Sequence, residues 1–275
     1  METKMIENQY GIPAIGFGTY DRKGEAGIEA MLVALDTGYR HLDTAQDYGT
    51  EGEVGQAVRR SRIPRENVFV TTKIATGNLG PGKLIPSLKR SLDNLQLDRL
   101  DLTLIHWPSP NDEVPLTVYM EQMAEAHALG LTRLVGVSNF TIALLQAAQQ
   151  VLGPIPIANN QFELNPLLQN KKLATYCTNS GISVTCYLPI ARGLLGKVPA
   201  MIEIADRHGA TPEQVALAFE LAKGYIAIPT SGKPDRIRSN FEATKLALTE
   251  DDMAAIETVD RGQRVIDPVW GPAWD

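Results

Sequence analysis

The chain has 275 residues, of which 44% are hydrophobic and 21% are charged, and its net charge is −6. These values are ordinary for a folded protein and exclude an intrinsically disordered chain. The acidic balance, without any run of basic residues, argues against nucleic acid as a partner. The length suits one domain of about 250 residues, which is typical of a barrel of alternating strands and helices.

The first 20 residues contain no basic segment followed by an apolar run, and no stretch approaches the roughly 18 uncharged residues of a membrane span. We therefore expect a cytoplasmic protein without a membrane partner. We also expect a monomer. The two cysteines, Cys177 and Cys186, have no CxxC spacing and lie in separate apolar segments. This pattern favours free structural thiols over a disulfide or a redox pair.

Apolar runs rich in β-branched residues recur along the chain and predict eight strands. They lie at residues 15–19, 39–45, 68–74, 100–107, 134–140, 158–164, 182–188 and 225–231. The segments between them have helical periodicity, for example residues 25–36 and residues 83–95. Glycines that follow three of these segments are candidate left-handed helix caps: Gly38, Gly130 and Gly181.

Eight strand and helix units with nearly continuous apolar strands indicate a parallel sheet covered by helices. A single domain over residues 1–275 closes such a sheet most simply as a (β/α)8 TIM barrel. An open, doubly wound sheet is the alternative. The first predicted strand opens the stretch IGFGTYDRKGE, in which the glycines lack the GxGxxG spacing of a Rossmann site.

Four polar side chains lie at or just beyond the ends of successive predicted strands: Asp43, Tyr48, Lys73 and His106. Barrels of this kind carry their active sites at the carboxyl ends of the strands. Taken singly, the four have ordinary explanations as a helix cap, a surface aromatic, a solvated strand end and a core histidine. Their convergence at one end of the barrel predicts a common site. A buried Lys73 needs a counter-ion, and Asp43 is the available one.

We interpret these four side chains as a unit for acid–base catalysis. A phenol has an unperturbed pKa of about 10. We expect the Lys73 ammonium to lower the pKa of Tyr48, with Asp43 holding the ammonium in place. His106 would orient a carbonyl oxygen that Tyr48 protonates while hydride reaches the carbon. The four histidines are dispersed, without an HxH or HExxH pair, so no metal site is expected.

At these residues the chain resembles the aldo-keto reductase family, and the resemblance covers nearly its whole length. Six segments carry it in order: residues 38–58 (GYRHLDTAQDYGTEGEVGQAV), 70–74, 102–108, 136–140, 159–166 and 228–240. Asp43, Tyr48, Lys73 and His106 match the four catalytic positions of the family. The resemblance implies an NADPH-dependent oxidoreductase that reduces carbonyl groups, with Tyr48 as the proton donor.

The resemblance also implies a set of cofactor-binding residues. At the nicotinamide and its ribose these are Thr19, Asp43, Ser138, Asn139, Gln161 and Tyr187, where Tyr187 stacks on the ring. At the adenosine end they are Ser231, Lys233, Arg236 and Asn240. A helix beginning near Pro234 would offer unpaired amides, and the adjacent cations would select a 2′-phosphate, so NADPH is preferred over NADH. Many family members carry a lysine where this chain has Thr230 and a glutamate where it has Ser239, which makes Lys233 the candidate for the missing charge.

The loops predict an open pocket for small polar aldehydes and ketones. Only ten residues, 108–117, separate the fourth strand from its helix, and the tail 265–275 is short. Within the family these lengths, and the stretch IHWPSPNDEV, resemble the bacterial 2,5-diketo-D-gluconic acid reductases, the B type above all. Substrates of the 2,5-diketo-D-gluconate or 2-oxoaldehyde type are therefore expected, in contact with Tyr48, His106 and Trp107. Two tail residues, Trp270 and Trp274, either wall this site or bury the tail.

Two other functions compete with carbonyl reduction. Barrels of this family also serve as channel subunits and lens proteins, so the chain could be a non-catalytic NADP(H)-binding module. Retention of all four polar groups favours catalysis. A barrel hydrolase would need a metal cluster or an activated nucleophile, and the sequence presents neither.

Overall fold

The computed structural model describes residues 8–275, in which eight strands form one parallel sheet ordered β1 to β8 along the chain. The strands are β1 (Phe17–Gly18), β2 (His41–Asp43), β3 (Phe69–Ile74), β4 (Leu100–Ile105), β5 (Thr132–Ser138), β6 (Ile157–Glu163), β7 (Ser183–Tyr187) and β8 (Ile226–Ala227). All eight predicted strands are present. The strand order never reverses, whereas a doubly wound sheet requires a reversal.

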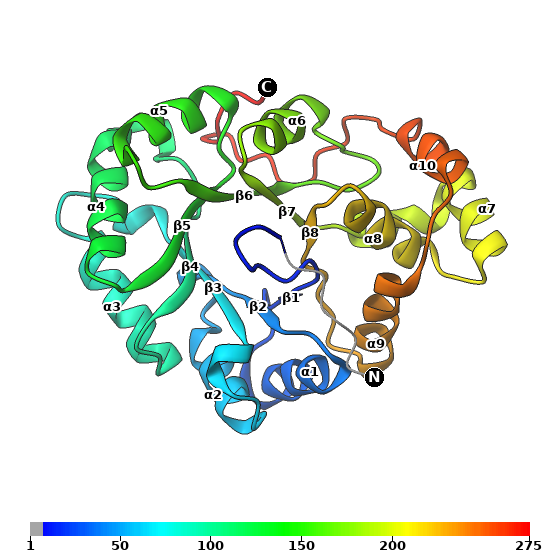
Figure 1. Ribbon diagram of the computed structural model, residues 1–275, viewed down its shortest axis with the longest axis horizontal. Helices are drawn as coiled ribbons and strands as arrows, with labels where there is room; N and C mark the ends of the chain where they lie inside the picture. Colours follow the sequence, from blue (N-terminus) through cyan, green and yellow to red (C-terminus); the bar gives the residue numbers. More distant parts are fainter. Residues whose placement is uncertain (1–7) are drawn as a thin grey trace.

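Helices follow the strands and surround the sheet (Figure 1). They are α1 (Gly24–Thr37), α2 (Glu51–Arg60), α3 (Leu84–Leu95), α4 (Leu116–Ala128), α5 (Ile142–Leu152), α6 (Lys171–Asn179), α7 (Pro199–His208), α8 (Pro212–Ala222), α9 (Pro234–Glu242) and α10 (Glu250–Glu257). Gly130 and Gly181, both at φ 70°, have the expected left-handed conformation, whereas Gly38, at φ 127°, lies outside that region.

The sheet is strongly curled, so that its first and last strands approach each other. A parallel bridge joins Ile15, just before β1, to Ala227 in β8. The amide of Gly16 donates to the carbonyl of Ala227 at 2.8 Å, and the amide of Gly18 donates to the carbonyl of Pro229 at 3.0 Å. The structure therefore confirms eight parallel strands that alternate with helices in a curled sheet.

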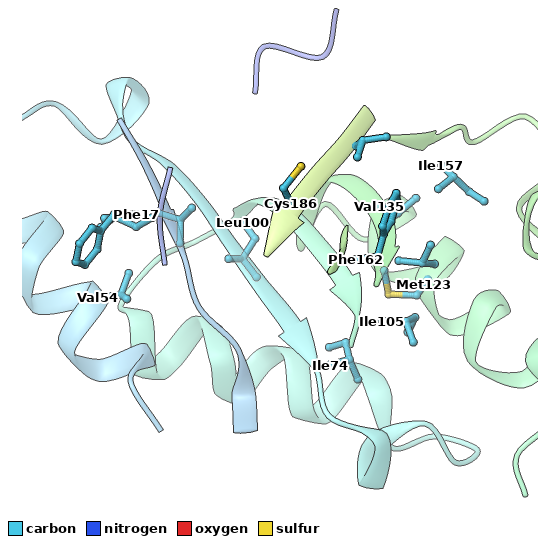
Figure 2. Close-up of a cluster of buried hydrophobic side chains, with 14 of the residues drawn as sticks. Phe17, Val54, Ile74, Leu100, Ile105, Met123, Val135, Ile157, Phe162 and Cys186 are labelled. Carbon is cyan, nitrogen blue, oxygen red and sulfur yellow. The ribbon is translucent and has the colours of Figure 1, made fainter. Parts of the chain in front are cut away.

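The two faces of the curled sheet carry different side chains. On the convex face, strand residues such as Ile74 and Phe162 belong to one buried apolar cluster with helix residues such as Val54 of α2 and Met123 of α4 (Figure 2). A separate apolar cluster on the concave face joins residues of β3, β4 and β8 to one residue before β1 and one after β8: Ile12, Phe69, Leu102, Leu104, Ile226 and Ile228. Because successive side chains of a strand point to opposite faces, Lys73 faces inward with Phe69.

Two structural features are absent from residues 8–275. No helix in this part of the chain is both long and apolar enough to cross a membrane. Nor does it contain a group of three or more His, Cys, Asp or Glu side chains that could hold a metal ion. Cys177 and Cys186 are buried free thiols, as the sequence predicted.

Candidate active site

The carboxyl ends of β2, β3 and β4 bring three of the four predicted polar groups to one edge of the sheet. Asp43 is the last residue of β2, and Lys73 is the last but one of β3. His106 was expected inside the fourth strand, but β4 ends at Ile105 and His106 is the next residue. The register of β2 on β3 pairs Asp43 with Thr71, so Lys73 lies two residues further along the same inward row.

The ammonium of Lys73 is fully buried and has three oxygen partners. It forms an ion pair with the carboxylate of Asp43, donates to the carbonyl oxygen of Thr44 at 2.9 Å, and lies 3.4 Å from the hydroxyl of Tyr48. Burial alone would lower the pKa of Lys73, but the carboxylate of Asp43 and the hydroxyl of Tyr48 together outweigh burial, and the pKa is raised. The side chain is therefore a cation at neutral pH, held against Asp43 and Tyr48.

Tyr48 is presented by a short 3-10 helix, η1 (Gln46–Tyr48), that follows β2. Gln46 fixes this turn to the neighbouring loop, because its side-chain oxygen accepts from the amide of Ala75 at 2.8 Å and from the Asn78 side chain at 2.9 Å. The Tyr48 ring meets the ring of Tyr20 edge to face, at a centroid distance of 5.2 Å. These contacts fix the direction of the phenol. No sequence pattern had pointed to Gln46 or Tyr20.

The acidity of Tyr48 differs from the prediction. Burial raises the pKa of this phenol above its usual value of about 10, and the nearby Lys73 ammonium opposes the rise without reversing it. The expectation of a lowered pKa was therefore wrong in its net direction, although Lys73 acts with the expected sign. A desolvated phenolate is costly, and one cation that already pairs with Asp43 compensates only part of the cost.

His106 is held from both sides. Its Nδ1 lies 3.1 Å from the carboxylate of Asp47, and its backbone oxygen accepts from the side chain of Asn139 at 3.1 Å. The rings of His106 and Tyr48 meet edge to face at 5.5 Å. Burial lowers the pKa of His106 below its usual value, and the hydrogen bond to Asp47 opposes that shift. Asp47 was not predicted, although it directly precedes Tyr48 in the sequence.

The residues expected at the nicotinamide end form one hydrogen-bonded network. Gln161 of β6 donates to the carboxylate of Asp43 at 2.8 Å, and Ser138 donates to the Gln161 carbonyl at 2.8 Å. The hydroxyl of Tyr187 donates to Asn139 at 2.9 Å. Because β2 and β6 are not neighbours in the sheet, the bond from Gln161 to Asp43 crosses its concave side. Amide and hydroxyl groups thus line this end of the sheet, beside Lys73.

Two further features complete this network. Thr19, just after β1, donates to the backbone oxygen of Asp43 at 2.9 Å. Asn139 adopts a left-handed backbone conformation with φ 63°, which asparagine tolerates better than most residues. The structure therefore brings together all six residues that the sequence placed at this end.

The residues expected at the adenosine end lie on the loop after β8 and on α9. The helix begins at Pro234, as predicted, and Lys233 at its N-cap provides no side-chain cap. Lys233 and Arg236 are exposed, and the amide of Lys233 donates to the Ser231 hydroxyl at 3.0 Å. The hydroxyl of Thr230 is buried without a hydrogen-bond partner in residues 8–275. Uncapped amides, an orphaned hydroxyl and two cations together fit an anionic group.

The fourth predicted residue of this set, Asn240, is buried near the end of α9. No hydrogen bond within residues 8–275 joins Asn240, Ser231, Lys233 or Arg236 to the strand-end network. These four residues therefore lie outside the hydrogen-bonded network of the strand ends.

The C-terminal tail lies beside the residue that follows His106. Trp107 meets Trp270 at a centroid distance of 5.3 Å and Trp274 at 6.1 Å, both edge to face. The buried carboxylate of Glu163, at the end of β6, accepts from the amides of Val265 at 2.9 Å and Ile266 at 2.8 Å. In Figure 1 the tail, drawn in red, runs past α6 and ends near α5. Both tail tryptophans therefore pack on Trp107. Glu163 anchors the tail to β6 and was not predicted.

Comparison with known proteins identifies the family. The family model described as "Aldo/keto reductase family" matches residues 14–261, which is most of the chain. The chain belongs to the aldo/keto reductase family. The chain is 46% identical over 265 residues to a Yersinia pestis protein named methylglyoxal reductase DkgB, covering 96% of this chain and 99% of that protein.

Two further similarities extend the comparison. The chain is 40% identical over 249 residues to 2,5-diketo-D-gluconic acid reductase B of a Corynebacterium species, covering 90% of this chain and 89% of that one. It is similar to the solved structure of an aldose reductase from Schistosoma japonicum, with a TM-score of 0.89 at 32% identity, covering 96% of this chain and 94% of that one. Membership of this family supports an oxidoreductase that acts on carbonyl groups.

Proposed function

We propose that the protein reduces small polar aldehydes and ketones to alcohols with NADPH, and that Tyr48 supplies the proton. One observation carries the proposal: a buried Lys73 ammonium contacts both Asp43 and the Tyr48 hydroxyl at the carboxyl ends of the strands. A buried cation against a phenol stabilises the phenolate that proton donation leaves behind. The names of the relatives point to 2-oxoaldehydes such as methylglyoxal and to 2,5-diketo-D-gluconate as substrates.

Each side chain of the strand-end site has a part in this reaction. NADPH, when bound, supplies the hydride to the carbonyl carbon. Tyr48 donates its hydroxyl proton to the carbonyl oxygen, so that C=O gains one hydride and one proton and becomes CH–OH. Lys73 stabilises the phenolate, and Asp43 keeps Lys73 in place. Together with Tyr48, the substrate contacts are His106 and Trp107.

The cofactor would be held at two places. At the nicotinamide end the holding residues are Thr19, Asp43, Ser138, Asn139 and Gln161, with Tyr187 against the ring. At the adenosine end they are Ser231, Lys233, Arg236 and Asn240. The uncapped start of α9 and its exposed cations suit a 2′-phosphate, which favours NADPH over NADH.

We also infer the molecular setting of this reaction. The bridge between Ile15 and Ala227 supports a closed (β/α)8 TIM barrel, with residues 1–275 as one domain. The protein would work as a monomer in the cytoplasm on a small-molecule carbonyl substrate.

A single assay separates this function from its main alternative, a non-catalytic NADP(H)-binding barrel module. Purified protein is mixed with NADPH and with methylglyoxal or 2,5-diketo-D-gluconate, and NADPH absorbance and the product alcohol are measured. We expect consumption of NADPH that requires the carbonyl compound. Tight NADPH binding without consumption, across a panel of keto-sugars, 2-oxoaldehydes and aromatic aldehydes, would instead identify a binding module.

A further inference from the structure

The loop after β1 reaches the loop before α9 through one side chain, that of Arg22. A Cβ atom built on Gly232, in the loop after β8, would lie only 2.5 Å from Nη1 of Arg22. The guanidinium therefore occupies space that any residue other than glycine would take up. Gly232 lies between Ser231 and Lys233, two of the residues proposed at the adenosine end. Arg22 is thus a third cation in this region, besides Lys233 and Arg236, and it comes from a distant part of the chain.

The backbone around Arg22 fixes where its side chain begins. The Arg22 amide donates to the carbonyl of Thr19 at 2.9 Å, and Asp21 has a left-handed conformation with φ 61°, so the chain turns tightly after β1. Gly27 of α1 packs against this turn, because a Cβ built on it would overlap the Arg22 carbonyl oxygen. The curl of the sheet brings β1 next to β8, and with it this turn next to the loop that follows β8.

Most donors of the Arg22 guanidinium are unused by the protein. Nε donates to the Tyr20 carbonyl at 3.3 Å, and the two Nη groups form no hydrogen bond within residues 8–275. The carboxylate of Asp21 lies 3.7 Å away, on a side chain that is 74% exposed, so water screens this ion pair. A guanidinium presents its N–H donors in a planar fork that matches a phosphate group. The head group of Arg22 is therefore available to bind one.

We propose that Arg22 binds the 2′-phosphate of NADPH together with Lys233 and Arg236, and so helps to select NADPH over NADH. This proposal rests on the proposed function and deepens its cofactor site. The chain has Thr230 where many members of the family carry a lysine, and Arg22 would supply that charge from the other loop. The buried Thr230 hydroxyl, two residues before Gly232, has no hydrogen-bond partner within residues 8–275. An anion bound beside the guanidinium would provide one.

The first test measures the affinity of Arg22→Gln for two cofactors by fluorescence titration. We expect Kd for NADPH to rise about 10- to 150-fold, the worth of a charge-assisted bond to phosphate, and Kd for NADH to change less than about 2-fold. Lys23→Gln is the matched control, because it removes an exposed cation from the next position of the same loop and should leave both Kd values unchanged. Equal losses for both cofactors would mean that Arg22 only joins the two loops, and this result would overturn the proposal.

A second variant moves the guanidinium without removing it. In Gly232→Ala the new methyl group would collide with Nη1 of Arg22, which is the flexible end of a long side chain, so the protein should still fold. Kd for NADPH should rise selectively. In the double variant with Arg22→Gln, the same methyl group should have little further effect, because the group that it displaces is gone. Fully additive losses would show that the two positions act independently and would contradict the proposal.

These outcomes can be told apart from a failure of the proposed function. Both titrations are done without a carbonyl compound, so a protein that reduces no aldehyde or ketone would still give the comparison of Kd values. A wild type that binds NADPH no more tightly than NADH would overturn the cofactor preference and the role of Arg22 together. A wild type that prefers NADPH, with an Arg22→Gln variant that keeps this preference, would overturn the role of Arg22 alone.

Discussion

The strand-end site and the start of α9 place their charges in opposite surroundings. At the strand ends, Lys73 and Asp43 are buried and form an ion pair, and each has a further hydrogen-bond partner. At the start of α9, Lys233 and Arg236 are exposed to solvent. At the strand ends of the proposed cofactor site, the charged groups are therefore paired with other groups of the protein. At the start of α9, the cations are exposed and can contact a bound anion.

This difference predicts how each end responds to substitution. A buried charge that loses its partner is strongly destabilising, and donors fixed in a buried site act mainly on the transition state. Exposed charges are screened by water and salt, so they contribute to binding and little to folding. Substitutions at the strand ends should alter turnover or stability, and those at α9 should alter cofactor affinity alone.

The largest effect is expected for Tyr48→Phe. The ring and its contact with Tyr20 remain, and only the proton donor is lost. General acid catalysis is worth roughly 10² to 10⁴-fold, so kcat should fall by about that factor while NADPH still binds. Steady-state kinetics and a fluorescence titration with NADPH measure the two quantities. Turnover close to that of the wild type would remove Tyr48 from the mechanism.

Lys73→Met should lower both stability and activity. The change keeps much of the side-chain volume but leaves the Asp43 carboxylate buried without its cation, which costs about 3 to 5 kcal/mol in the free energy of unfolding. Chemical denaturation measures this loss. Lys89→Met, on the exposed face of α3, is the control and should stay within about 0.5 kcal/mol of the wild type. A Lys73→Met protein as stable as this control would mean that the ion pair contributes nothing.

The pH dependence of Lys73→Met isolates its electrostatic role. Tyr48 must carry its proton to donate it, so the rate falls as pH rises through the Tyr48 pKa. Burial already raises that pKa, and the Lys73 cation opposes the rise. Removing the cation should raise the pKa further and move the alkaline limb of the rate profile to higher pH. An alkaline limb that stays in place, with unchanged activity, would exclude Lys73 from the proton-donor unit.

The sequence could predict the strand-end site because the site follows from a simple periodicity. Strand side chains alternate between the two faces, and parallel strands bring their carboxyl ends to one edge, so Asp43 and Lys73 had to converge. The bond from Gln161 to Asp43 depends in addition on the curl of the sheet. That bond was predictable only through the resemblance to a family, which placed both residues at the nicotinamide end.

Other parts of the site depend on contacts between distant segments, which no local pattern encodes. The contact of Asp47 with His106 requires the 3-10 turn that Gln46 fixes to the loop after β3. The raised pKa of Tyr48 depends on the depth of its burial rather than on its neighbours in sequence. The bonds from the Val265 amide to the Glu163 carboxylate span 102 positions of the chain.

Arg236→Ala should have the smallest effect on the enzyme itself and a selective effect on its cofactor. Arg236 is exposed on the first turn of α9, so its loss should change the free energy of unfolding by less than about 0.5 kcal/mol. A charge-assisted hydrogen bond to phosphate is worth roughly 1.5 to 3 kcal/mol, or about 10- to 150-fold in Kd, and NADH lacks the 2′-phosphate.

Fluorescence titration of Arg236→Ala with NADPH and with NADH should therefore give a large loss of affinity for the first and almost none for the second. Arg238→Ala is the matched control on the same helix, because Arg238 lies 3.7 Å from the carboxylate of Asp235 and is not among the proposed phosphate contacts. At saturating NADPH, kcat of Arg236→Ala should match the wild type, since no group at the strand ends has changed. Equal losses for both cofactors would show that Arg236 does not recognise the phosphate. A fall in kcat comparable to that of Tyr48→Phe would show that the two ends of the site are coupled. It would contradict the proposal that residues of α9 affect cofactor affinity alone.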